Sequence, residues 1–233
     1  MERGGQAKHN EAHAIDKVTV EAVALDMDGL LVDTERIFWQ VGDAVLGRRG
    51  HRYSQALQAR MMGRVGVASI QEMIDFHGLE DEPESLMREC DEMYSELLPK
   101  LVRPMPGLDD WMNLLRNSEI PHALTTSSRR KWVEIIFAEL DWDDSFQFIL
   151  TGDDVTHGKP DPEMYLTAAS RFGVAPSRML VLEDSGNGCA AGVAAGAAVV
   201  AVPNEHTAEQ DFDGAVLIAK SLNDPRLHTL ISG

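Results

Sequence analysis

Acidic, hydroxyl-bearing and basic residues stand at or after the ends of four apolar segments, and their types suit phosphoryl chemistry. The segments are VTVEAVALD (18–26), HALTT (122–126), FQFIL (146–150) and MLVLED (179–184). The polar residues are, in chain order, Asp26, Asp28, Thr126, Ser127, Ser128, Lys159, Glu183 and Asp184. Carboxylates that converge on one spot repel each other unless a cation lies among them. Because Mg²⁺ prefers oxygen ligands and keeps room for a substrate phosphate, the set predicts a Mg²⁺ site.

Each residue type in this set has a chemical use. A carboxylate beside the metal can attack a phosphoryl group and form an aspartyl-phosphate. A second carboxylate two residues further on can protonate the leaving oxygen and later deprotonate water. A lysine supplies a compact positive charge for the phosphoryl oxygens, and a hydroxyl donates a hydrogen bond to them.

The elements that must position these residues alternate along the chain. Together with a fifth apolar segment, AVVAV (198–202), the four segments have the continuous apolar character of buried strands. Helical spacing of apolar residues appears between them, over 107–117, 131–140 and 162–172. This alternation predicts an α/β fold, a doubly wound parallel sheet whose ligand site lies beyond the carboxyl ends of the strands.

One long segment interrupts the alternation. Between Glu35 and Pro104 apolar residues recur at helical spacing, and no stretch resembles a strand. The segment LVRPMPG (101–107), with two prolines and a glycine, is typical of a linker that returns to the core. The sequence therefore predicts a helical insert of about 70 residues after the first strand.

Composition excludes several classes of protein. The 233 residues are 44% hydrophobic and 25% charged, which excludes a disordered chain, and no apolar run could span a membrane. The formal net charge of −17 disfavours nucleic acid or an anionic membrane as partner. The two cysteines, 99 positions apart, make no disulfide framework and indicate a reducing, cytoplasmic setting. Residues 1–17 lack the apolar core of a signal peptide, and we expect a flexible leader.

Four short motifs resemble those of the haloacid dehalogenase superfamily. DMDGLLVDTE (26–35) is similar to its first motif, and Thr126 in ALTTSS stands where its second motif places a hydroxyl. GKPDP (158–162) and LEDSGNG (182–188) resemble its third and fourth motifs. The resemblance implies a Rossmann-like core over 18–34 and 105–233. It also implies an α-helical cap over 35–104, as in the β-phosphoglucomutase-like branch.

The resemblance also implies a role for each motif residue. Asp26 is expected to be the nucleophile and Asp28 the general acid/base. Thr126 and Lys159 are expected to bind the phosphoryl group, with Ser127 or Ser128 able to share the role of Thr126. The expected Mg²⁺ ligands are Asp26, the backbone carbonyl of Asp28, Asp184 and, through water, Glu183.

The function expected from these roles is a Mg²⁺-dependent phosphatase that acts on a small soluble phosphate monoester, such as a sugar phosphate or nucleotide-like compound. The alternative is a sugar-phosphate mutase of the β-phosphoglucomutase type. The mutase pattern carries a histidine twelve residues beyond the nucleophile, where this sequence has Phe38. Dehalogenases and phosphonate-cleaving relatives lack the second aspartate, so Asp28 disfavours both. A phospho-receiver domain has no place for the helical insert.

Substrate choice is expected to lie in the insert. Gly63 and Arg64, in MMGRVG, are candidates for substrate contact, because an arginine at a turn between cap helices suits an anionic or polyhydroxylated group. Glu35 and Trp39 are further candidates on the first helix of the insert. We expect a monomer whose partner is a small phosphate substrate, with neither a nucleic acid polymer nor a membrane as partner.

Overall fold

The computed structural model describes residues 19–61, 66–142 and 144–231. The expected leader, 1–17, and the candidates Gly63 and Arg64 lie outside these residues. The strands are β1 (Ala22–Leu25), β2 (His122–Thr125), β3 (Ile149–Leu150), β4 (Met179–Glu183), β5 (Ala198–Ala201) and β6 (Leu217–Ile218). The α-helices are α1 (Glu35–Gly47), α2 (Gln55–Met61), α3 (Val67–His77), α4 (Pro83–Leu101), α5 (Leu108–Asn117), α6 (Arg130–Leu140), α7 (Glu163–Phe172), α8 (Gly186–Ala194) and α9 (Pro225–Thr229).

The strands form one parallel sheet in the order β3-β2-β1-β4-β5-β6, so β1 lies between β2 and β4. Leu25, the last residue of β1, is in register with Leu124 of β2 and Leu182 of β4. The carboxyl ends of the three central strands therefore lie at one level. This arrangement confirms the predicted doubly wound α/β fold and brings the residues after these strands together.

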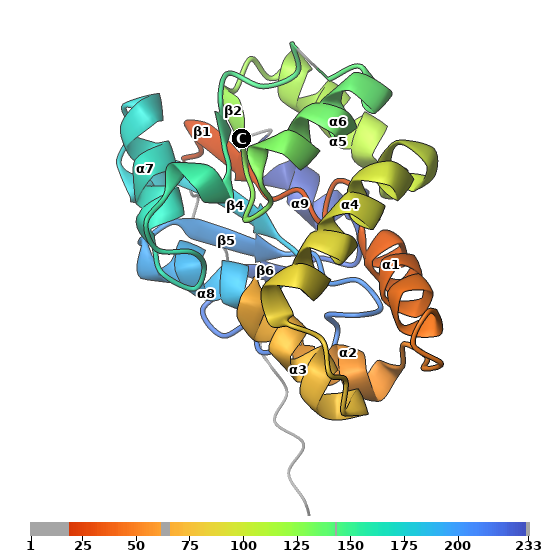
Figure 1. Ribbon diagram of the computed structural model, residues 1–233. Coiled ribbons are helices and arrows are strands. Elements are labelled where there is room, and N and C mark those ends of the chain that lie inside the picture. The colour runs from red at the N-terminus through yellow and green to blue at the C-terminus, as the bar shows by residue number, and fades with distance from the viewer. Residues whose placement is uncertain (1–18, 62–65, 143, 232–233) are drawn as a thin grey trace, which may run out of the picture.

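Helices cover both faces of the sheet (Figure 1). The small residues Ala22 and Ala24 of β1 pack in the cluster that includes α7 and α8, whereas Val23 and Leu25 belong to the cluster that includes α5, α6 and α9. Alternate strand residues point to opposite faces, and here both sets are fully buried. This burial explains why β1 has a continuous apolar sequence.

The strands are shorter than their apolar segments. Of FQFIL, only Ile149 and Leu150 form strand β3, although the backbones of Gln147 and Phe148 also hydrogen-bond to β2. Phe146 and Phe148 instead pack against other aromatic rings, Phe146 on Phe137 and Phe148 on Phe172. Three of the described strands and α-helices were not expected from the sequence: β6, with two residues at the sheet edge, α2, with seven, and α9, with five.

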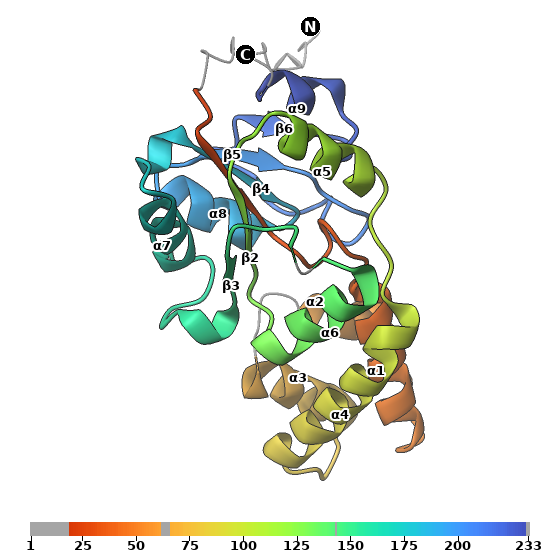
Figure 2. The ribbon, with the colours of Figure 1, turned by 90° about the horizontal axis from the view of Figure 1, so that it is seen from above.

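Helices α1 to α4, residues 35–101, form the helical insert between β1 and α5. Figure 2 shows these helices gathered at one end of the molecule, with α6 beside them. Helix α4 packs on α1 and α3 within the insert, and its contacts with α6 join the insert to the rest of the chain. Among the described helices, none is long and apolar enough to cross a membrane.

Candidate active site

The turn after β1 places Asp26 and Asp28 at the carboxyl edge of the sheet. The backbone N–H of Asp26 still donates to Leu182 O of β4, at 3.1 Å. The chain then turns back, with Gly29 N donating to Val32 O at 2.8 Å. Gly29 has φ +76°, and a Cβ there would lie 2.4 Å from Oδ2 of Asp184. Glycine is required because the turn passes directly against Asp184.

Most of the predicted site residues line one cavity of about 800 Å³. Its walls include Asp26, Asp28, Ser127, Lys159 and Asp184. Glu35 also lines it, so the helical insert borders the same space. Trp39 lies elsewhere, edge-on against Tyr53 with ring centroids 5.1 Å apart. The expectation that Trp39 faces the site is not supported by this packing.

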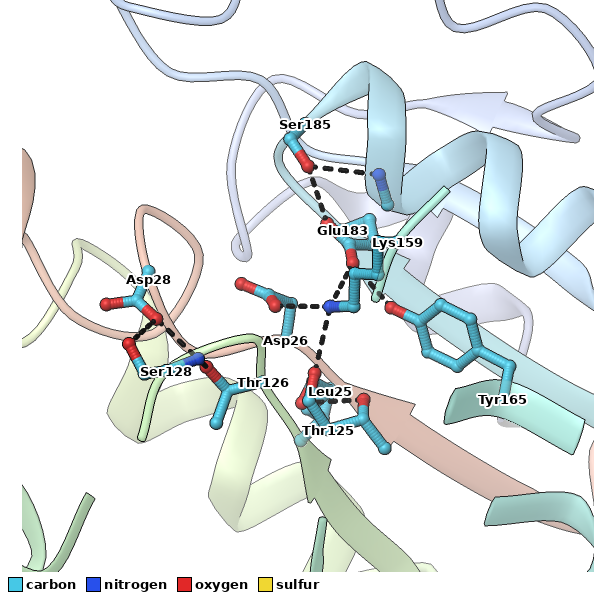
Figure 3. A network of polar contacts seen from close by, with 11 residues as sticks. Leu25, Asp26, Asp28, Thr125, Thr126, Ser128, Lys159, Tyr165, Glu183 and Ser185 are labelled. Carbon is cyan, nitrogen blue, oxygen red and sulfur yellow. Dashed lines mark hydrogen bonds and ion pairs between the residues drawn. The ribbon is translucent and has the colours of Figure 1, made fainter. Parts of the chain in front are cut away.

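Lys159 is the centre of a buried charge network (Figure 3). Its Nζ lies 2.6 Å from Oδ1 of Asp26 and 2.6 Å from Oε1 of Glu183, and it donates to Thr125 O at 3.0 Å. Burial disfavours the ammonium charge, but the two carboxylates outweigh burial and raise the pKa of Lys159 well above its usual range. Lys159 is therefore positively charged throughout the neutral pH range.

The carboxyl groups of Asp26 and Asp184 have raised pKa values. Burial is the main cause for both. Glu183 adds to it for Asp26, Asp26 adds to it for Asp184, and Lys159 opposes both shifts. Oxygen atoms of Asp26, Glu183 and Asp184 all lie within 4.8 Å of one another. Carboxylates held this close in a buried place repel each other, so the arrangement suits a cation.

Glu183 is fully buried and does not itself line the cavity, although two of its partners, Lys159 and Ser185, do. Its Oε1 accepts hydrogen bonds from Lys159 and from the hydroxyl of Tyr165, and its Oε2 accepts one from Ser185 at 3.2 Å. The N-cap of α8 is Ser185, whose hydroxyl accepts from Gly188 N.

The hydroxyl residues after β2 hold Asp28. Thr126 and Ser128 both donate to Oδ2 of Asp28, at 2.9 and 2.8 Å, and Ser128 N donates to the Thr126 hydroxyl. Oδ1 of Asp28 is buried and has no hydrogen-bond partner among the described residues. One carboxylate oxygen is therefore fixed in place, and the other is available to a ligand.

Two residues at the site were missed by sequence reasoning. Asn204 donates to Oδ2 of Asp184 at 2.8 Å and to Gly29 O at 3.2 Å. It follows β5 at the same edge of the sheet, so the rule that found the other residues could have found it. Tyr165 looked like one more apolar residue on the helix over 162–172, and only the fold shows that its hydroxyl meets Glu183.

Known proteins resemble this chain over most of its length. A phosphorylated carbohydrates phosphatase of Thermotoga maritima is 32% identical over 180 residues, 76% of this chain and 82% of that protein. A probable pseudouridine-5′-phosphatase of Drosophila melanogaster is 33% identical over 205 residues, 85% of this chain and 88% of that protein. A putative β-phosphoglucomutase structure from Thermotoga maritima superposes with a TM-score of 0.73 at 29% identity, covering 87% of this chain and 95% of that chain.

The family model for haloacid dehalogenase-like hydrolases matches residues 23–202. This range contains all four motifs, from Asp26 to Asp184, and covers well over half of the sequence. The chain belongs to the haloacid dehalogenase-like hydrolase family.

Proposed function

We propose that this hydrolase is a Mg²⁺-dependent phosphatase that cleaves a small soluble phosphate monoester through an aspartyl-phosphate on Asp26. One observation carries the proposal. Asp26 and Asp28 line one cavity together with a buried lysine, and Lys159 Nζ lies 2.6 Å from Oδ1 of Asp26. The names of relatives support it, since they include phosphatases of phosphorylated carbohydrates, glycerol 3-phosphate and fructose 1-phosphate.

The donor set fits a hard divalent cation. Oxygens of Asp26, Glu183 and Asp184 are close together and buried, and carboxylate oxygens are ligands that Mg²⁺ accepts. We assign Asp26, Asp184 and the backbone carbonyl of Asp28 as ligands, with Glu183 acting through water. When bound, the metal would neutralise the charge of the phosphoryl oxygens and of the surrounding carboxylates.

The first chemical step needs a nucleophile and an acid. A carboxylate oxygen of Asp26 attacks phosphorus while the bond to the ester oxygen breaks. Asp28, in its protonated form, gives its proton to that oxygen, and the alcohol leaves. The two hydroxyls on Oδ2 of Asp28 leave Oδ1 as the atom that carries the proton.

The second step restores the enzyme. Asp28, now a carboxylate, takes a proton from a water molecule, which attacks the phosphorus of the aspartyl-phosphate and releases inorganic phosphate. Lys159 supplies fixed positive charge for the phosphoryl oxygens in both steps. Ser127 lines the cavity and can donate to the phosphoryl group. Thr126 is fully buried, and its contact with Asp28 suggests that it contributes by holding the acid/base in place.

The insert is proposed to act as a cap, residues 35–104, on a core formed by 18–34 and 105–233. Glu35 and Ala59 of the insert line the same cavity as Asp26, which supports a role in enclosing substrate. We further propose that the protein acts as a monomer in the cytoplasm. The free cysteines Cys90 and Cys189 and the negative surface are compatible with that setting.

A sugar-phosphate mutase remains the second candidate, because a structure named as a putative β-phosphoglucomutase is similar. Phe38 lines a cavity beside Asp28 and carries no group that exchanges protons. The mutase pattern has a histidine at this place in the sequence, so the presence of Phe38 favours the phosphatase over the mutase.

Release of inorganic phosphate from a panel of sugar phosphates and nucleoside monophosphates tests the proposal. We expect release with Mg²⁺, none with a chelator, and none from Asp26→Asn. Absence of release from every ester, with β-glucose 1-phosphate converted to its 6-phosphate, would instead establish the mutase.

A further inference from the structure

A second cavity, of about 400 Å³, lies between the helical insert and the loop after β2. Asp28 and Ser127 line both this cavity and the larger one that contains Asp26 and Lys159. We call the second space the aromatic cavity, because Phe38, Tyr53, Tyr94 and Trp132 are among its walls. It begins where the proposed phosphoryl site ends.

The position of Asp28 determines which part of a substrate enters this space. Asp28 is proposed to protonate the oxygen of the departing alcohol, so that oxygen must lie beside it. The phosphoryl group lies on the other side, with Asp26 and Lys159. The alcohol therefore extends from Asp28 into the aromatic cavity.

Three aromatic rings form a continuous series along this cavity. Phe38 of α1 stacks on Tyr94 of α4 with centroids 4.7 Å apart, and Tyr94 meets Trp132 of α6 at 4.7 Å. Phe38 keeps 39% of its surface exposed, although it belongs to a helix whose other apolar residues are mostly buried. A ligand that covers this ring removes apolar surface from water, and that burial contributes favourably to the free energy of binding.

The described residues that line the aromatic cavity offer no unpaired cation. Arg129 is the one basic side chain among the described residues that line it, and its guanidinium bonds Asp91 of α4 at 2.6 Å. A second phosphate on the alcohol would meet Asp28 and Asp91 without a free cation from these residues. The cavity therefore suits an uncharged alcohol.

Tyr94 adds one polar feature. Its side chain is almost fully buried, and its hydroxyl has no hydrogen-bond partner among the described residues. A buried hydroxyl without a partner costs free energy that a ligand can recover. A polyol offers many hydroxyls and little flat surface, whereas a heteroaromatic ring offers a flat face for Phe38 and a few polar atoms for Tyr94.

We propose, resting on the phosphatase function above, that the substrate is a monophosphate whose alcohol carries an uncharged heteroaromatic ring, as nucleoside 5′-monophosphates do. The ring lies in the aromatic cavity against Phe38. A sugar phosphate without a heteroaromatic ring fills the phosphoryl site but leaves the exposed face of Phe38 in contact with water. The aromatic cavity is then the feature that selects among esters with the same reacting oxygen.

The test compares ribose 5-phosphate with the four ribonucleoside 5′-monophosphates. All five compounds are esters of the same primary 5′ oxygen, so a difference in kcat/KM between them measures the contribution of the base. We expect at least one nucleotide to exceed ribose 5-phosphate about ten-fold or more. Phe38→Ala should bring that ratio close to one by lowering kcat/KM for the nucleotide. Phe148→Ala, which removes a ring packed on Phe172 on the other side of the sheet, should leave the ratio unchanged.

A binding measurement keeps this inference separate from the phosphatase proposal. Asp26→Asn should bind the preferred nucleotide about ten-fold more tightly than ribose 5-phosphate in calorimetry, with no turnover required. Equal affinities, or a kcat/KM ratio near one that Phe38→Ala does not change, would overturn the assignment of the aromatic cavity. Loss of all phosphate release in the panel would overturn the phosphatase function, and calorimetry would still test the cavity.

Discussion

Gly188, in the first turn of α8, lies directly against the buried carboxylate of Glu183. A Cβ at this position would lie 2.0 Å from the carboxyl carbon of Glu183, a distance that no real contact reaches. The helix can therefore approach the end of β4 only because residue 188 has no side chain. The contact fixes Glu183, and Glu183 in turn accepts a hydrogen bond from Lys159.

Gly188→Ala is expected to destabilise the protein by about 1–3 kcal/mol, because the added methyl group forces Glu183 or α8 to move. Phosphate release should also fall, since Lys159 loses a fixed partner. Gly47→Ala is the matched control: Gly47 lies in α1, and no atom is within 4 Å of an added Cβ. Denaturant unfolding and phosphate release check both variants. Equal stability of the two variants would contradict the packing argument.

Lys159→Met is expected to lower the free energy of unfolding by about 3–5 kcal/mol at neutral pH, since it leaves Asp26 and Glu183 buried without their cation. Burial already raises the pKa of Asp26 and Lys159 opposes that shift, so without the ammonium group the folded state holds a proton on Asp26 still more tightly than the unfolded state does. The stability of the variant should therefore rise as the pH falls toward 5.

Urea unfolding at several pH values measures the effect of Lys159→Met. The exposed Lys220→Met is its control and should stay within about 0.5 kcal/mol of the unmodified protein. A Lys159 variant whose stability does not depend on pH in this range would contradict the buried network.

Asp28→Asn is expected to slow turnover about 10²–10⁴-fold while the fold is kept, because the amide oxygen can still accept from Thr126 and Ser128. The loss should be smaller in the first step for an ester with a good leaving group, such as p-nitrophenyl phosphate, which needs little protonation. Burst and steady-state kinetics on that ester and on an alkyl phosphate separate the steps. An equal loss in the first step for both esters would remove Asp28 from the acid role.

The sequence located most of the site because the strands that position it are buried on both faces. A continuous apolar run such as MLVLE then shows where a strand ends, and the rule for parallel sheets places the next residues at one edge. Asp26, Lys159 and Asp184 were found in this way. The same rule, applied to the strand before Pro203, would have included Asn204.

Contacts that depend on packing could not be predicted in this way. Tyr165 and Phe38 both have the apolar character of helix residues that face a core. The fold shows that the Tyr165 hydroxyl bonds Glu183 and that Phe38 stays partly exposed in a cavity. Helical spacing shows on which side of its own helix a residue lies. It does not show which residues of other elements pack against that side. The two-residue strand β6 is too short to leave a pattern.

Asp224, far from the site, caps α9. Its interactions there should make the stability of the protein depend on pH. Its carboxylate accepts from Arg226 N and from the Arg226 guanidinium, and these bonds hold its pKa well below the usual range. A carboxyl with a lowered folded pKa stabilises the fold above its unfolded pKa of about 4 and loses that contribution as pH falls below it. Asp224→Asn should thus lower Tm by a few degrees at pH 7.

The difference in Tm between Asp224→Asn and the unmodified protein should shrink as the pH falls from 5 to 3. Thermal unfolding across this range measures it, with Glu209→Gln as an exposed control that changes the net charge by the same amount. A constant difference across the range would show that the carboxylate charge contributes nothing.

Asp91→Asn is expected to change substrate preference more than stability. The pair of Asp91 and Arg129 is partly exposed, so its loss should cost no more than about 1 kcal/mol. The freed guanidinium, however, faces a cavity beside Asp28 and can then attract an anion. Glycerol 3-phosphate and 3-phosphoglycerate differ by a carboxylate, and the variant should raise the kcat/KM of the second relative to the first about ten-fold.

The gain should shrink at high ionic strength, because salt screens exposed charges. Asp75→Asn, an exposed substitution on α3, should leave the ratio as it is. If Asp91→Asn also leaves it unchanged, then Arg129 does not reach the bound alcohol.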